Sequence, residues 1–302
     1  MRWSWARNLA VFGSLQAPGG LSTLWLVDYN DMFSYPPRLT PKGYFAAGWQ
    51  SILATKWQAL KGNLATFVGV QNLVFLTPFA LLGWGKRWRA EGLLPATLYG
   101  LALFAAMTFA FSLPGVRGGW LHSGAALVPY LAAAATLGLE DAVRWAAKCR
   151  RGWRASEAWR VFGAASAVFA LLVTVTMVIL RVVGLGDLST VAWNRSTSVY
   201  DAVSAALDWD GAPLEARVMS NNPPGLYAHT GRGGIPLVNG GEADLLRAAD
   251  DYGATYVVLD RNVPAGLSGL YWEGPASPRL VLVSTAGAAP DRVQLYRILP
   301  PH

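Results

Sequence analysis

Residues 161–180 read VFGAASAVFALLVTVTMVIL and contain no charged side chain. About 20 apolar residues in a helix cross the roughly 30 Å of hydrocarbon in a bilayer. We therefore expect a membrane span over about 161–183. Three further runs are comparably apolar, at about 64–84, 92–116 and 118–139. The sequence thus predicts a polytopic α-helical membrane protein with about four transmembrane helices in a bundle over 64–184.

The overall composition agrees with this pattern. Of the 302 residues, 53% are hydrophobic and only 14% are charged, whereas soluble domains carry about 25% charged residues. The net charge of +7 could indicate nucleic-acid binding, but the basic residues crowd into two short loops between apolar runs. We interpret them as topology signals and expect no nucleic-acid partner. Cys149 is the single cysteine, so no intrachain disulfide can form.

The loop charges orient the spans. Lys86, Arg87 and Arg89 follow the first span, and a second basic cluster between the last two spans comprises Arg144, Lys148, Arg150, Arg151, Arg154 and Arg160. Basic loops stay in the cytoplasm, so this pattern predicts a multi-pass protein of the plasma (inner) membrane. Residues 1–63 and 185–302 would then both lie outside the cytoplasm.

Exporting residues 1–63 requires a signal. The N-terminal MRWSW has no apolar segment of the signal-peptide kind. We therefore expect further spans upstream, a missing N-terminal transmembrane half of which this chain would be the continuation.

Residues 1–40 are rich in aromatic and turn-forming residues and predict an irregular external loop. Thr40 is a candidate N-cap with Pro41 at the first helical position, and an amphipathic helix over 40–63 would lie on the membrane surface. Within the loop, Asp28 and Asp31 could bind a divalent cation, the one cofactor we consider, or serve as acid/base groups. They could equally form Asx turns or cap a short helix.

Residues 185–302 alternate helix and strand patterns and predict a small extracytoplasmic three-layer α/β domain. We expect helices over 198–207, from about 223 and over 242–252, and strands over 216–220, 235–238, 255–259, 279–284 and 292–298. The loop Gly231–Gly234 lacks the Gly-Lys-Ser/Thr ending of a P-loop. Its Arg232 and the nearby His229 are expected to be ordinary surface groups.

The third span opens with Arg117-Gly-Gly-Trp-Leu-His122. An Arg/His pair near the bilayer surface is costly unless it meets an anion or a carboxylate, and a lipid-linked phosphate would suit Arg117. The alternative is that Arg117 contacts lipid headgroups and His122 bonds within the bundle.

Three motifs occur in a familiar order: Asn8–Ser14 with Asp28-Tyr29-Asn30-Asp31, then Arg117–Pro129, then Val218–Pro223. This order resembles the C-terminal half of bacterial GT-C glycosyltransferases, the protein-mannosyltransferase and aminoarabinose-transferase-like group. The resemblance implies transfer of a sugar from a polyprenyl-phosphate carrier to an acceptor on the outer face, with Arg117, His122 and Tyr29 as candidate substrate contacts.

In that group the principal catalytic carboxylate lies in the first external loop, which has no counterpart here. Asp28 and Asp31 are therefore only weak catalytic or metal candidates, and the chain alone is expected to be inactive. The alternative is a non-enzymatic, membrane-anchored binding or assembly module. A transporter would need broken helices with midplane polar groups, for which Gln71-Asn72 gives the one hint.

Overall fold

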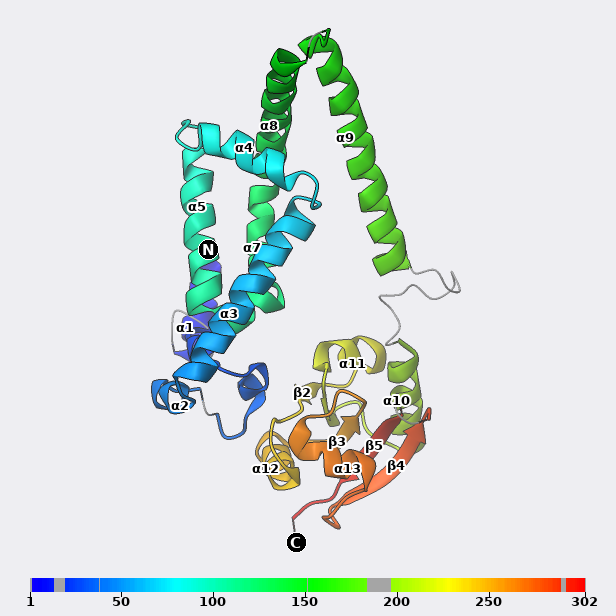
Figure 1. Ribbon diagram of the computed structural model, residues 1–302. Coiled ribbons are helices and arrows are strands. Elements are labelled where there is room, and N and C mark those ends of the chain that lie inside the picture. Colours follow the sequence, from blue (N-terminus) through cyan, green and yellow to red (C-terminus); the bar gives the residue numbers. More distant parts are fainter. Residues whose placement is uncertain are drawn as a thin grey trace. The chain divides into compact units, whose positions relative to one another are not determined.

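The computed structural model describes residues 2–13, 20–37, 39–150, 152–183, 197–288 and 292–301. The chain forms two compact units (Figure 1). The first unit comprises residues 1–28 and 40–179, and the second comprises residues 29–39 and 180–302. The predicted boundary near 184 lies outside the described residues.

The first unit is helical. Its α-helices are α1 (Arg2–Phe12), α2 (Pro41–Ala46), α3 (Trp49–Thr66), α4 (Thr77–Arg87), α5 (Leu94–Ala105), α6 (Ser112–Pro114), α7 (Trp120–Gly124), α8 (Val128–Cys149) and α9 (Ala155–Val178). Short π-helical turns extend several of them, at Phe67–Gln71, Ala106–Ala110, Gly115–Gly119 and Ile179–Val183.

Among the described residues of this unit, two helical stretches are long and apolar enough to cross a membrane. Ser112–Cys149 spans 38 residues with a mean hydropathy of 1.3, and Ala155–Val178 spans 24 residues with a mean hydropathy of 2.3. No residue in the most apolar part of α9 is buried inside the protein, so the rest of the unit does not cover this apolar helix. By length and composition, these two helices give weak support for membrane association.

The expectation of four continuous spans is met only in part. The predicted span 64–84 is broken between the π-helical turn Phe67–Gln71 and α4, where Leu73 and Val74 take the left-handed φ values of 49° and 62°. The predicted span 92–116 leaves the helical conformation at Phe111, whose ψ is 54°. Neither run is one uninterrupted helix. The prediction missed both breaks because an apolar pattern does not indicate local changes in backbone conformation.

The first forty residues also differ from the prediction. The expected irregular loop contains helix α1 and two 3-10 turns, Leu21–Trp25 and Tyr29–Phe33. Helix α1 forms because glycine and proline first appear after Phe12. Thr40 is the N-cap of α2, accepting a hydrogen bond from Gly43 N at 3.1 Å, as predicted. The expected single helix over 40–63 is interrupted at Gly48, whose φ is 83°.

Helices α4 and α8 pack closely at two glycines. A Cβ at Gly83 would lie 1.9 Å from the Ala134 carbonyl oxygen, and a Cβ at Gly138 would lie 1.9 Å from that of Phe79. Only glycine permits this backbone approach, the small-residue packing typical of membrane helices.

The second unit is a three-layer α/β domain, as predicted. Its helices are α10 (Thr197–Trp209), α11 (Pro223–Thr230), α12 (Glu242–Tyr252) and α13 (Ser268–Trp272), and its strands are β1 (Arg217–Ser220), β2 (Gly234–Pro236), β3 (Ala254–Leu259), β4 (Leu280–Ala286) and β5 (Val293–Ile298). The sheet order is β2-β1-β3-β5-β4. Strands β1, β2 and β3 are parallel, while β5 is antiparallel to β3 and β4.

Strand β3 shows why the sheet is covered on both faces. Tyr256 and Val258 pack in the core under α10 and α11, while Val257 and Leu259 pack in the core under α12 and α13. Successive side chains of a strand point to opposite faces, so an apolar run requires two covering layers. Helix α13 was not predicted, since its five residues are too few for a helical period to show.

Candidate functional site

The Arg117 turn is shaped by Gly118. This residue has φ 126° inside the π-helical turn Gly115–Gly119, a conformation that side-chain-bearing residues rarely adopt. A Cβ on Gly118 would lie 3.2 Å from Cδ2 and 3.3 Å from Nε2 of His122. The imidazole of His122 therefore lies against the backbone next to Arg117. Both predicted residues are exposed, Arg117 on the turn and His122 on the helix that follows it.

An apolar hollow of about 340 Å³ opens in the same unit. Its lining comes from α3, α4, α5, α7, α8 and the segments beside them: Leu64, Phe67, Ala80, Leu81, Trp84, Ala96, Thr97, Gly100, Leu101, Phe104, Trp120, Leu127 and Leu131. The polar atoms of Trp84 and Thr97 are paired, since Trp84 Nε1 donates to Thr97 Oγ1 at 2.9 Å. Such a surface suits a hydrocarbon chain.

Trp120 joins the hollow to the Arg117 turn. It is the first residue of α7, it is 2% exposed, and its ring packs edge-on against Phe104 with centroids 5.1 Å apart. His122 lies on the same five-residue helix. The exposed cationic turn and the apolar lining thus meet along one short stretch of chain.

A polar seam runs between α3 and the α6 region beside this site. Lys56 Nζ donates to Ser112 Oγ at 2.9 Å, and Ser112 Oγ donates to the Thr108 carbonyl at 2.7 Å. Asn63 Nδ2 donates to Thr108 Oγ1 at 3.0 Å and to the Met107 carbonyl at 3.2 Å. The seam was not predicted, because each member is a single polar residue in or beside an apolar run.

The acidic candidates lie around the 3-10 turn Tyr29–Phe33. Asp28 directly precedes this turn and Asp31 lies in its first turn, so the positions agree with a capping or turn role. Among the residues that the structure describes, no three His, Cys, Asp or Glu side chains gather to hold a metal ion. The metal and acid/base roles of Asp28 and Asp31, and the substrate role of Tyr29, stay predictions.

The segment that follows belongs to the α/β unit. Asn239 N donates to the Phe33 carbonyl at 2.8 Å. The Tyr35 hydroxyl donates to the Asp251 carboxylate, and this hydrogen bond raises the pKa of Tyr35. The Tyr35 ring packs edge-on against Tyr252, with centroids 5.9 Å apart. We call residues 29–37 the strap, because they are held on the α/β unit across a long separation in sequence.

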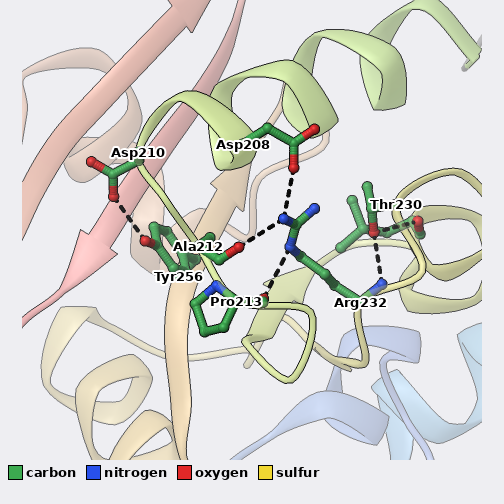
Figure 2. Close-up of polar contacts among 8 residues, drawn as sticks. Asp208, Asp210, Ala212, Pro213, Thr230, Arg232 and Tyr256 are labelled. Atoms are coloured by element: carbon green, nitrogen blue, oxygen red, sulfur yellow. Dashed lines mark hydrogen bonds and ion pairs between the residues drawn. The ribbon is translucent and has the colours of Figure 1, made fainter.

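The expectation that Arg232 is an ordinary surface group is wrong. Arg232 is 4% exposed, and Figure 2 shows its guanidinium surrounded by acceptors. Its Nη2 donates to Asp208 Oδ1 at 2.7 Å and to the Ala212 carbonyl at 2.8 Å, and its Nε donates to the Pro213 carbonyl at 3.2 Å. The loop glycines around Arg232 gave no sign that the end of α10 would cover it.

A second polar group lies beside this cluster (Figure 2). The Tyr256 hydroxyl donates to Asp210 Oδ2 at 2.8 Å. Arg297 lies 3.3 Å from the same carboxylate oxygen. Burial, followed by the hydrogen bond to Asp210, raises the pKa of Tyr256. His229 is partly exposed, 3.5 Å from Asp201. These contacts are internal to the α/β unit, and those of Asp210 hold the residues that follow α10.

No protein-family model, curated protein or solved structure matches this chain.

Proposed function

We propose that the chain is the C-terminal part of a membrane glycosyltransferase that moves a sugar from a polyprenyl-phosphate carrier to an acceptor on the outer face. The observation that carries the proposal is the meeting of the Arg117 turn and the apolar hollow at Trp120. A polyprenyl phosphate joins an anionic head to a long hydrocarbon chain, so it complements both parts of this site.

In this proposal each part of the site has its own role. The Arg117 guanidinium donates charge-assisted hydrogen bonds to the carrier phosphate, and His122 contacts the same headgroup. The hollow holds the first isoprene units of the chain. Tyr29 is a further candidate substrate contact, and Asp28 and Asp31 are candidate ligands of a divalent cation.

The proposed topology follows the loop charges. The bundle over 64–184 lies in the plasma membrane, with residues 1–63 and 185–302 on the outer side. Helix α9 supports the membrane location, because an apolar helix of 24 residues is long enough to span a bilayer and the protein leaves it unburied.

Binding of farnesyl phosphate and farnesol to the chain in detergent micelles tests the site. We expect Arg117→Ala to weaken farnesyl phosphate about tenfold, since hydrogen bonds to charged groups contribute about 1.5–3 kcal/mol and exposure reduces this. Farnesol should bind the variant as it binds the wild type. Arg89→Ala removes another arginine of the same unit and is the matched control.

Equal farnesyl phosphate affinity in wild type and Arg117→Ala would remove Arg117 from the mechanism. Failure of both prenyl probes to bind the wild type would instead favour the non-enzymatic module, whose outer α/β unit would bind a partner or a carbohydrate.

A further inference from the structure

Two residues near the helix break after the π-helical turn Phe67–Gln71 have buried polar groups without hydrogen-bond partners in the described part of the chain. Gln71 is 7% exposed, and neither its Oε1 nor its Nε2 has a partner. Trp120 is 2% exposed, and its Nε1 also has none. Such groups have lost their bonds to water without replacement, which is costly. Native interiors keep few of them, so each needs an explanation.

These groups lie together beside the apolar hollow. A Cβ on Gly124 would lie 2.4 Å from Gln71 Nε2 and 3.7 Å from Cδ2 of the Trp120 ring. Trp120 lines the hollow, and so do Leu64 and Phe67 from the segment that carries Gln71. Gln71 is not part of this lining, but its amide lies beside Gly124 next to the Trp120 ring, so two hydrogen-bond donors and one acceptor lie close to a space that is otherwise apolar.

The backbone around Gln71 is held in an unusual conformation. The π-helical turn ends at Gln71, and Leu73 and Val74 follow with φ values of 49° and 62°. The side chain of the adjacent Asn72 is used structurally, donating to the Phe67 carbonyl at 2.9 Å. Non-glycine residues in the left-handed region and π-helical turns are frequent at functional sites.

We propose that Gln71 and Trp120 form a binding site for the hydroxyl group of an otherwise apolar molecule whose hydrocarbon part occupies the hollow. A hydroxyl donates to Gln71 Oε1 while its oxygen accepts from Gln71 Nε2 or Trp120 Nε1, so it satisfies donors and acceptor together. A pure hydrocarbon would leave all three atoms unpaired. The site requires the hollow but does not depend on sugar transfer.

The test compares 1-decanol with decane, which differ by the hydroxyl, as ligands of the full chain in detergent micelles. Affinity is measured from the shift of the thermal unfolding midpoint with ligand concentration. The quantity of interest is the ratio of the two affinities, because partitioning into micelles is the same for every variant. We expect this ratio to fall about five- to tenfold in Gln71→Leu, the loss of one hydrogen bond.

Thr55→Val is the matched control. Thr55 is also a buried polar residue of α3, but its hydroxyl bonds the Val27 and Ser51 carbonyls, and its loss should leave the ratio unchanged. The second measurement follows the ¹⁵N-labelled indole resonances of the wild type, with Trp120 assigned through Trp120→Phe. We expect 1-decanol, and not decane, to shift the Trp120 N–H signal, even if Gln71→Leu fails to fold.

Two results would overturn the proposal. One is an unchanged affinity ratio in a folded Gln71→Leu. The other is an indole resonance that responds equally to both probes or to neither, as expected if the groups are dry or bind water only. Neither result involves Arg117 or phosphate, so the glycosyltransferase proposal is tested separately.

Discussion

Replacing Arg232 by alanine should strongly destabilise the α/β unit. The side chain is 4% exposed and donates to one carboxylate and two carbonyls. Leaving a buried hydrogen-bonding group without its partner costs about 1–3 kcal/mol. Asp208 is 64% exposed, so water rehydrates its carboxylate and the loss falls mainly on the Ala212 and Pro213 carbonyls. We therefore expect about 3–4 kcal/mol.

Hydrogen–deuterium exchange of the β3 amides in the full chain measures this loss, since β3 is the central strand of the sheet and is covered on both faces. A loss of 3–4 kcal/mol accelerates exchange by roughly 150- to 700-fold, at about 1.4 kcal/mol per tenfold. Arg217→Ala is the matched control, because Arg217 is exposed and donates to one carbonyl, that of Tyr252 at 2.6 Å. Its expected effect is at most about tenfold. Similar exchange rates in the two variants would refute the reasoning from burial.

Three further predictions concern other parts of the chain. The hydrogen bonds from Arg279 at 2.5 and 3.0 Å lower the pKa of Asp250. This pair therefore stabilises the fold at pH values above the ordinary carboxyl pKa, and its contribution is lost as the pH falls through the lowered pKa of Asp250. We expect wild type to be more stable than Asp250→Asn at pH 6 by less than about 1 kcal/mol, because the carboxylate is 39% exposed. Urea titrations should show this difference in unfolding free energy closing between pH 6 and pH 2. A difference that widens on acidification would contradict the prediction. Gly138→Ala should destabilise the first unit by about 1–3 kcal/mol through overpacking against α4, as measured by thermal unfolding in detergent. Gly85→Ala is the control and should not destabilise the unit, because a Cβ at Gly85 meets nothing within 4 Å. The single, exposed Cys149 should resist a membrane-impermeant maleimide in intact cells and react after lysis, because the basic loop is predicted to be cytoplasmic; labelling of intact cells would reverse the proposed topology.

The α/β unit could be read from the sequence almost element by element. Helix α12 begins and ends at the predicted residues, and β3 starts one residue early, because a 3.6-residue apolar period specifies the helix and a short continuous apolar run specifies the strand. The cap at Thr40 was equally predictable, since Thr-Pro fixes both the acceptor and the first φ. Local chemistry was enough in each case.

The candidate site was less predictable. Arg117 and His122 could be singled out, but the hollow is formed by side chains from five helices and has no local signature. An apolar run reads alike whether its helix is continuous or broken, so the left-handed residues after Gln71 could not be foreseen. The burial of Arg232 depends on α10, which lies about twenty residues earlier in the sequence. The glycine-rich sequence around Arg232 is typical of an exposed loop and gives no indication of this burial.

The strap has a consequence for how the polypeptide is made. Tyr35 leaves the ribosome well before Asp251 and Tyr252, with the whole helical bundle in between. At about 5–20 residues per second, the strap waits on the order of ten seconds for its partner. During that interval its aromatic side chains have no folded surface to cover, so completion of the α/β unit depends on a segment synthesised before the bundle.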